Sequence, residues 1–386
     1  MKEKFLRELA DIQTGPFGSQ LHKEDYVADG TPIVTVEHLG NKMFSEQNLP
    51  RVSNTDKNRL KKYVLKQGDI VFSRVGSVDR CSYVDQKHDG WMFSGRCLRV
   101  RPTSEIDSEY LYYYFCLEET KQFVRNIAVG ATMPSINTKL LGEVVVTFPE
   151  LEQQKRISGI LSAIDSKIEV NQKINDNLEQ QAATLFSSLY NRSNTEVRYT
   201  DLIQILGGGT PKTGETAYWN GNIAFFTPKD VGVPYTFITE KTITEEGLSH
   251  CNSRLYPVNT VFVTARGTVG KVGLSGVPMA MNQSCYALVG KETHQLLVYF
   301  YTLKAVDRLK HKASGAVFDA ITTRDFDSEQ IMKLSDDDAK AFLCVAEPMF
   351  QEILNNSIEN LRLSTLRDFL LPKLMSGEID VSSVQI

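Results

Sequence analysis

The chain has 386 residues, more than one hydrophobic core usually serves, and this length suits two to four domains. A hydrophobic content of 41%, a charged content of 23% and a net charge of −4 are ordinary for a soluble globular protein. No apolar run reaches the ~20 residues that span a bilayer, so we expect no membrane partner. Six cysteines without a CxxC spacing favour reduced thiols and a cytoplasmic location, and the scattered histidines predict no metal site.

Residues 1–149 predict a first globular domain of strands, turns and a helix. A turn-rich segment at 14–20 contains two glycines and a proline, which are typical of a loop. The helix is expected from Ser108, a plausible N-terminal cap, to Ile127. The β-branched stretches that predict strands are 31–36, 63–65, 69–74 and 92–100.

A long helix is predicted over 150–192, because apolar residues recur there at alternating steps of four and three. This spacing is the heptad pattern of a helix that packs on another helix. Two asparagines interrupt the apolar seam. The central seam residues are Ile164, Ile168, Asn171, Asn175 and Leu178.

The same seam returns 185 residues later, inside a second predicted helix segment at 336–386. Its central residues are Met349, Ile353, Asn356, Asn360 and Leu363, with the two asparagines at matching places. A buried Asn accepts only a polar partner and therefore fixes helix register. We expect the two helices to pair antiparallel, with Asn171 and Asn175 facing Asn356 and Asn360. Two unrelated amphipathic helices, each buried in its own core, are the alternative.

Three residues of the second helix depart from the first copy. Pro348 stands where the first copy has Ala163, and a proline inside a helix costs ~3 kcal/mol, so we expect a kink or a restart there. Arg367 replaces Ala182 on the seam and is expected to extend toward solvent. Pro372 is expected to mark the end of the helix.

Residues 193–335 repeat the order of the first domain. The segment 260–267 parallels 70–76, and the strand at 281–289 parallels that at 92–100. The sequence therefore predicts an α+β protein with two similar globular domains, two long antiparallel helices and pseudo-two-fold symmetry.

Charge is distributed unevenly along the chain. From Arg51 to Arg101 there are twelve Lys/Arg against five Asp/Glu, a net charge of +7. Such a basic segment can neutralise phosphates within an acidic chain, since the effect is local. A solvated basic face without a partner is the alternative. The sequence contains no phosphate-binding loop, nucleophile elbow, kinase motif or methyltransferase motif. No catalytic residue is therefore predicted.

Four segments carry a resemblance to a known family. They are 15–19 (GPFGS), 69–76 (DIVFSRVG), 148–157 (FPELEQQKRI) and 366–379 (LRDFLLPKLMSGEI). Together they resemble the specificity subunits of type I restriction-modification systems, over essentially the whole chain.

This resemblance implies a non-enzymatic DNA reader. Each target-recognition domain would read one half of a split target in double-stranded DNA, with the helices as the spacer. Two modification (methyltransferase) subunits, which bind the cofactor S-adenosylmethionine, would dock on the helices, and restriction subunits would join them. No cofactor is expected in this chain. A protein scaffold with duplicated partner-binding domains, and no DNA, is the alternative function.

The candidate DNA contacts lie after predicted strands and in glycine-containing loops, where a backbone can approach a phosphate and Arg can read guanine. Ordinary solvated side chains are the alternative for each. The candidates are Thr35, Glu37, His38, Arg74, Arg96 and Arg99 in the first domain and Thr227, Lys229, Arg266 and Lys271 in the second.

Overall fold

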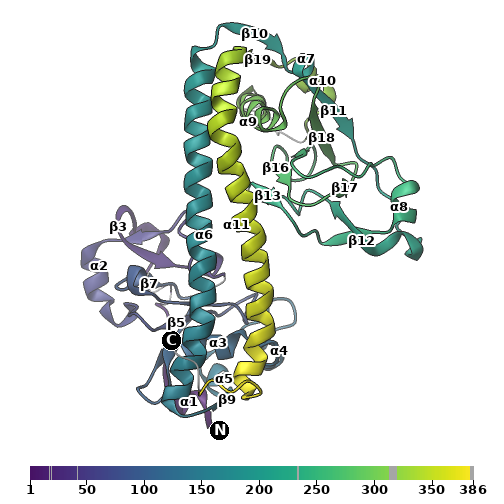
Figure 1. Ribbon diagram of the computed structural model, residues 1–386. Helices are drawn as coiled ribbons and strands as arrows, with labels where there is room; N and C mark the ends of the chain where they lie inside the picture. The colour runs from purple at the N-terminus through teal and green to yellow at the C-terminus, as the bar shows by residue number, and fades with distance from the viewer. Residues whose placement is uncertain (17, 19, 41, 233, 313–319, 383–386) are drawn as a thin grey trace. The chain divides into compact units, whose positions relative to one another are not determined.

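The computed structural model describes residues 1–16, 18, 20–40, 42–232, 234–312 and 320–382 (Figure 1). The chain forms two compact units. Unit 1 comprises Met1–Glu169 and Leu361–Ile386, and unit 2 comprises Val170–Asn360. Each long helix contributes residues to both units, so unit 1 is assembled from the two ends of the chain.

Unit 1 contains strands β1 to β9, most of them short. Their bounds are β1 (Lys2–Phe5), β2 (Ala10–Thr14), β3 (Tyr26–Val34), β4 (Arg51–Val52), β5 (Ile70–Ser73), β6 (Cys81–Tyr83), β7 (Met92–Phe93), β8 (Cys97–Pro102) and β9 (Val145–Phe148). Among the described residues they form a β1-β9 pair, a β2-β8-β5-β6 sheet and a β4-β3-β7 sheet. Within the part of unit 1 that the structure describes, β3 and β7 pair in parallel and the other strand pairs are antiparallel.

Short helices surround these sheets. They are α1 (Leu6–Leu9), α2 (Asn54–Arg59), α3 (Ser108–Cys116), α4 (Glu118–Ile127) and α5 (Thr138–Gly142), with 3-10 turns η1 (Lys23–Asp25), η2 (Val36–His38), η3 (Lys61–Tyr63) and η4 (Gln86–His88). The single helix expected over 108–127 is interrupted at Leu117, which adopts an extended backbone. Its cap is Asp107 rather than Ser108, because the Asp107 carboxylate accepts the backbone N–H of Tyr110 at 2.8 Å.

Unit 2 repeats this arrangement with strands β10 to β19. Their bounds are β10 (Thr195–Arg198), β11 (Ile203–Gly207), β12 (Trp219–Phe226), β13 (Tyr235–Thr236), β14 (Lys241–Ile243), β15 (Val261–Thr264), β16 (Val272–Ser275), β17 (Met279–Met281), β18 (Cys285–Gly290) and β19 (Gln330–Lys333). They form a β10-β19 pair, a β11-β18-β15-β16-β13 sheet and a β14-β12-β17 sheet. Apart from β13, each strand has a counterpart in unit 1.

The helices of unit 2 follow the same order. They are α7 (Tyr199–Leu202), α8 (Glu245–Ser249), α9 (Gln295–Lys312) and α10 (Thr323–Asp327), with the 3-10 turn η5 (Thr216–Tyr218). The helix α9 is continuous where unit 1 has the broken pair α3 and α4. The predicted α+β fold, with a globular domain and a long helix each present twice, is therefore confirmed.

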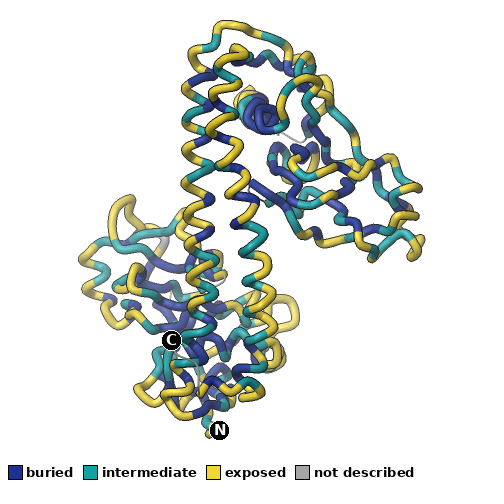
Figure 2. The backbone as a smooth tube through the Cα atoms, viewed as in Figure 1, coloured by how far each residue is buried: buried dark blue, intermediate teal, exposed yellow. Residues whose placement is uncertain are grey.

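The long helices are α6 (Leu151–Arg192) and α11 (Asp336–Ser376). Figure 2 shows buried and exposed residues alternating along both. In unit 2, Asn171 donates its side-chain amide to Asn360 at 2.9 Å and to Glu359 at 2.7 Å. Asn356 donates to the buried Asn175 at 3.0 Å. These crossed pairs define an antiparallel register, because the earlier residue of one helix meets the later residue of the other.

The apolar seam residues flank these asparagines. Leu178, Met349 and Ile353 belong to the unit 2 core, together with Phe186 of α6 and Phe342 of α11. Ile164, Ile168 and Leu363 are half-buried. The ends of the helices thus close the globular cores, while their centres rely more on polar contacts.

In unit 1, a polar chain joins the helix pair to α3. Arg367 of α11 donates to Asp165 of α6 at 2.8 Å, and Tyr113 of α3 donates to the same carboxylate at 2.6 Å. Arg367 therefore packs against α6 and does not extend into solvent as expected. Of the kink or restart expected at Pro348, the restart is wrong, and so is the end expected at Pro372, since α11 runs through both prolines to Ser376.

Replacing Asn175 or Asn356 singly with Leu should lower the free energy of unfolding by about 1–3 kcal/mol, because each change leaves a buried amide unpaired. The double replacement should cost less than the sum of the two, because both polar partners are then removed. Chemical denaturation measures this coupling. The matched control is Asn355→Leu on the exposed face of α11, and additive losses at 175 and 356 would contradict the pairing.

Candidate nucleic-acid interface

The carboxyl ends of four strands in unit 1 meet at one edge. Ser94, which follows β7, donates its backbone N–H to Val34 at the end of β3 at 2.9 Å. Arg74, which follows β5, donates its backbone N–H to the Arg96 carbonyl at 2.8 Å. Gly15, which follows β2, donates its N–H to the Cys97 carbonyl at 3.2 Å. These bonds gather the segments 15–20, 35–40, 74–80 and 94–96, which we call loop edge 1; Phe17 and Ser19 lie outside the described residues.

Unit 2 builds a similar edge, and the first two of the following backbone contacts match those of unit 1. Asn282 donates its N–H to Phe226 at 3.0 Å, and Ala265 donates to Ser284 at 2.8 Å. Gly209 donates to Met281 at 3.1 Å. The gathered segments are 208–214, 227–232, 265–271 and 282–284, which we call loop edge 2; position 233 lies outside the described residues.

Glycines allow the first loop of each edge to lie against the backbone of the segment that follows β7 or β17. A Cβ on Gly15 would stand 2.1 Å from the Ser94 carbonyl oxygen, and one on Gly208 would stand 2.2 Å from that of Asn282. Both distances are far below van der Waals contact, so no side chain fits at either position. The glycine-rich loops predicted from sequence are therefore packing elements of each edge.

A tight turn follows the central strand in each unit. Gly76 and Gly267 have φ values of 74° and 81°, a left-handed conformation that favours glycine. Aligning these glycines places Arg266 opposite Val75 and not opposite Arg74. The isolated bridges Val75–Ser135 and Arg266–Ala320 agree with this alignment. The two arginines are therefore one position apart on otherwise equivalent turns.

On loop edge 1, the candidate side chains differ in exposure. Arg96 and Glu37 are exposed. Arg74 is half-buried, and its guanidinium donates to the Gly95 carbonyl at 3.1 Å. The Thr35 hydroxyl donates to the Glu37 carboxylate at 3.0 Å. Arg96 is thus the candidate here with the most accessible cationic group.

Two candidates of unit 1 are buried, which gives no support for a contact with DNA. His38 is 2% exposed, and its imidazole contacts the Gln47 carbonyl at 3.1 Å and the Thr35 hydroxyl at 2.9 Å. Arg99 is 3% exposed and pairs with Asp11. Burial lowers the pKa of its guanidinium. The Arg99 guanidinium also donates to the Lys62 carbonyl at 3.2 Å, so the chain at Lys62 lies against it.

On loop edge 2, three basic candidates are exposed. They are Lys229, Arg266 and Lys271. Lys229 makes a long ion pair with Glu240 at 3.4 Å. The Thr227 hydroxyl donates to Asp230 at 2.6 Å and helps to close its turn. Arg266 and Lys271 lie at opposite ends of the Gly267 turn, so two cations flank one exposed backbone loop.

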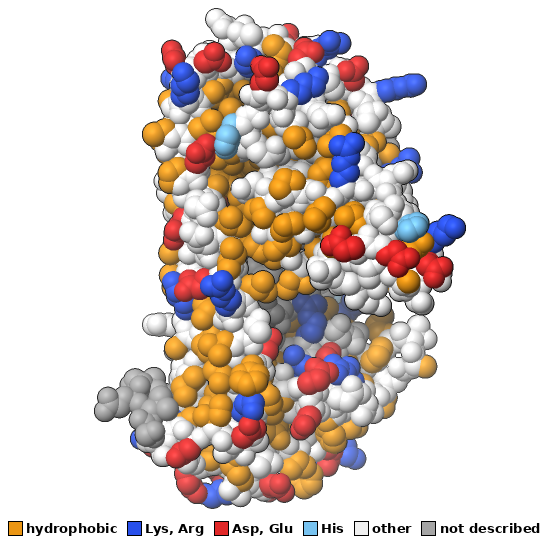
Figure 3. Space-filling view, turned by 45° about the vertical axis from the view of Figure 1, so that its right-hand side comes forward, with side chains coloured by type: hydrophobic (Ala, Val, Ile, Leu, Met, Phe, Trp, Pro, Cys, Tyr) orange, Lys and Arg blue, Asp and Glu red, His pale blue; other side chains and the backbone are white. Residues whose placement is uncertain are grey.

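The basic segment 51–101 does not form a continuous cationic surface. Four of its side chains pair internally: Arg59 with Asp56, Lys87 with Glu46, Arg99 with Asp11, and Arg101 with Asp69. On the face shown in Figure 3, basic side chains are scattered among acidic ones. The local charge of +7 therefore overstated the charge available to a partner.

The structure adds one residue, Arg80, to edge 1, and on edge 2 it places Gln283, an amide side chain suited to reading adenine. Arg80 is exposed and ends the turn that Arg74 begins. It was one of twelve basic residues in its segment, and nothing in its sequence context distinguished it. Gln283 is exposed and accepts a hydrogen bond from Thr210, which joins two loops of edge 2.

Among the described residues, no group of three or more His, Cys, Asp or Glu side chains could hold a metal ion. No helix within the described ranges is long and apolar enough to cross a bilayer.

The sequence of this chain matches the family described as type I restriction modification DNA specificity domain at residues 1–180 and again at 191–333. The two matches cover most of both units. The chain belongs to this family.

Relatives named as specificity subunits of type I restriction enzymes align over most of their length. The HindI specificity subunit of Haemophilus influenzae is 24% identical over 404 residues, covering 82% of this chain and 88% of the relative. The MjaIX specificity subunit of Methanocaldococcus jannaschii is 24% identical and covers 74% and 72%. The S subunit from M. genitalium shares the fold, with a TM-score of 0.59, 16% identity and coverage of 97% and 95%.

Replacing Gly208 with Ala should destabilise the protein by about 1–3 kcal/mol, because the new methyl group collides with backbone after β17. Its neighbour Gly207 provides the control, since a Cβ there meets nothing within 4 Å. Gly207→Ala should change stability by less than about 0.5 kcal/mol. Denaturant unfolding measures both, and equal effects would contradict the packing role of Gly208.

Proposed function

We propose that this chain is the DNA sequence-recognition subunit of a type I restriction-modification complex, and that each unit reads one half of a bipartite target in double-stranded DNA. The observation that carries the proposal is the duplicated loop edge. Similar backbone contacts present exposed loops with accessible cations twice in one chain. Membership of the specificity family supports the same function.

The exposed arginines are the main proposed contacts. Arg96 on edge 1 and Arg266 on edge 2 would reach phosphates or read guanine through two parallel hydrogen bonds. Arg74, Lys229 and Lys271 would add phosphate contacts, and Thr35, Glu37 and Thr227 would contact base edges. His38 and Arg99 are not proposed as DNA contacts, because both side chains are buried inside unit 1.

The chain is proposed to recognise DNA without catalysing a reaction. Methyl transfer and cleavage would belong to the modification and restriction subunits, and S-adenosylmethionine would be bound by the modification subunit. The absence of catalytic motifs from the sequence supports this division.

Two modification subunits are proposed to dock on the long helices. Exposed apolar side chains on α11 support a protein contact there. Phe369 is 60% exposed and Leu366 46% exposed, and both lie on unit 1 one helical turn apart. Aromatic anchors of this kind dominate the energetics of many interfaces.

Arg96→Ala and Arg266→Ala should each weaken specific DNA binding by about 1–3 kcal/mol, and each should relax the preference in one half of the target only. The measurement is a fluorescence titration of the assembled complex against targets mutated in either half. Arg7→Ala and Arg198→Ala are controls, since both residues are exposed and neither lies in a loop edge: Arg7 belongs to α1 and Arg198 to β10.

Equal binding to unrelated duplexes would contradict the proposal. Retained specificity in both arginine variants would also contradict it. A protein scaffold would keep its partner in all four variants and would show no salt-dependent affinity for DNA.

Phe369→Ser should reduce the affinity for the modification subunit by about 2 kcal/mol or more, because an interface anchor is lost. The folding of the isolated chain should be unaffected, since the side chain is exposed. Surface plasmon resonance with purified modification subunit measures the first effect and thermal unfolding the second. The exposed Leu151 of α6 offers a control position through Leu151→Ser. Unchanged affinity in Phe369→Ser would place the docking surface elsewhere.

A further inference from the structure

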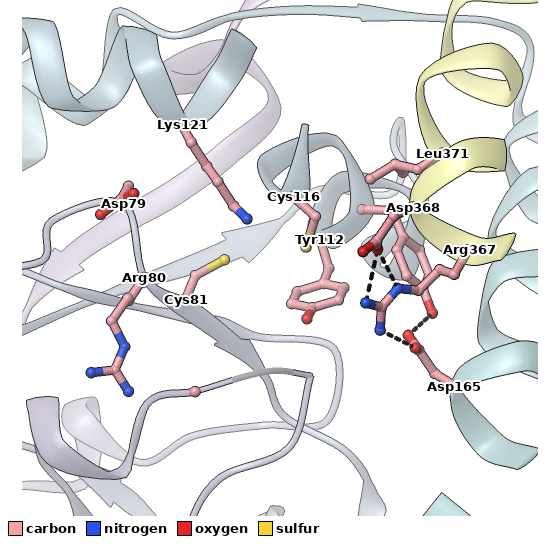
Figure 4. Close-up of a pocket in the computed structure, with 12 residues that line it drawn as sticks. Asp79, Arg80, Cys81, Tyr112, Cys116, Lys121, Asp165, Arg367, Asp368 and Leu371 are labelled. Carbon is pink, nitrogen blue, oxygen red and sulfur yellow. Dashed lines mark hydrogen bonds and ion pairs between the residues drawn. The ribbon is translucent and has the colours of Figure 1, made fainter. Parts of the chain in front are cut away.

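Unit 1 contains a cavity of about 180 Å³ beside the turn of loop edge 1. Its lining includes Asp79 and Arg80 from that turn, Cys81 from β6 and Cys116 from the end of α3. Figure 4 shows the sulfur atoms of Cys81 and Cys116 pointing toward one another, with the Lys121 ammonium group nearby.

The two thiols have unequal surroundings. Cys81 is buried, whereas Cys116 is half-buried and lines the cavity. The neighbouring Cys81 side chain lowers the pKa of Cys116, and the positive charge of Lys121 acts in the same direction. The neighbouring Cys116 side chain and burial raise the pKa of Cys81. Cys116 therefore has the features of an attacking thiolate, and Cys81 those of a resolving thiol.

The other cysteines lack this arrangement. Burial raises the pKa of Cys97 and of Cys285 to about 12, which keeps both protonated. Cys344 is exposed and Cys251 half-buried. Since thiolate character and access together determine oxidation, the Cys81–Cys116 pair stands apart within the same chain.

We propose that Cys81 and Cys116 form a peroxide-oxidisable thiol pair, which closes to a reversible disulfide inside unit 1. The oxidant is hydrogen peroxide, which can enter the cavity.

The reaction proceeds in two steps. The Cys116 thiolate attacks one peroxide oxygen, an S–O bond forms, the O–O bond breaks, and the leaving hydroxide takes a proton to become water. The Cys81 sulfur then attacks the Cys116 sulfur, the S–S bond forms and the S–O bond breaks. The departing hydroxide combines with the Cys81 proton as a second water. The two sulfurs lose two electrons, which reduce the peroxide.

The disulfide would link two functional parts of the unit. Cys81 directly follows the turn 74–80 of loop edge 1, so its position sets where that turn ends. Cys116 ends α3, whose Tyr113 donates to Asp165 of α6. Oxidation would therefore fix the turn against the helix that is bonded to the long helix pair.

The test is peptide mapping of the full-length reduced chain after graded exposure to hydrogen peroxide. Remaining thiols are blocked by alkylation, and the digest is analysed by mass spectrometry without reduction. We expect a Cys81–Cys116 cross-linked peptide to appear while Cys97 and Cys285 remain reduced, and to disappear after treatment with a dithiol. This measurement needs no DNA and does not depend on the proposed function.

Two variants separate the roles of the thiols. In Cys81→Ser, Cys116 should accumulate as a sulfenic acid that a 1,3-dicarbonyl reagent traps. In Cys116→Ser, Cys81 should stay reduced, and circular dichroism checks the fold of both variants. The proposal is overturned if the wild-type chain forms no 81–116 cross-link at doses that oxidise Cys344, or if Cys81 is oxidised equally in the absence of Cys116.

Discussion

The hydrogen-bonded asparagines between α6 and α11 are the constraint on which the structure depends. An apolar heptad seam alone tolerates slippage, because one leucine packs nearly as well as the next. Across the helix pair, Asn171 bonds to Asn360 and Glu359, and Asn175 bonds to Asn356 and Ser357. A shift by one turn would separate these buried amides from their polar partners. The fixed register in turn decides which part of α11 completes the core of each unit.

Register matters for function because both units use both helices. In unit 1, the Arg367–Asp165–Tyr113 chain carries the helix pairing into α3. The loop edges are then held by backbone bonds and glycine contacts, which involve few side chains. Such an edge can change its exposed residues without changing its framework. This property suits a family whose members are described by DNA specificity.

The sequence predicted the repeated elements better than the exposure of single residues. Periodicity and a constant offset of 185 identified both long helices, because a seam along helices of 42 and 41 residues leaves many matching positions. Pro348 misled the prediction, since local propensity is outweighed when Ala346 and Phe350 on either side are buried in the unit 2 core. Arg99 and His38 were expected to contact DNA, and the structure buries both side chains. Whether a basic residue faces solvent depends on which chain segment covers it, and Lys62 lies too far away in sequence to reveal that.

The two loop edges are alike in backbone but differ in where they present arginine. On edge 1, Arg74 precedes the left-handed Gly76 by two residues, whereas on edge 2, Arg266 directly precedes Gly267. Neighbouring residues in extended chain point to opposite sides, so this shift of one position redirects the cation. Under the proposed function, the two edges contact different groups of the duplex. A chain that arose by duplication would thereby read two different half-sites, because the framework is shared and the side-chain register is not.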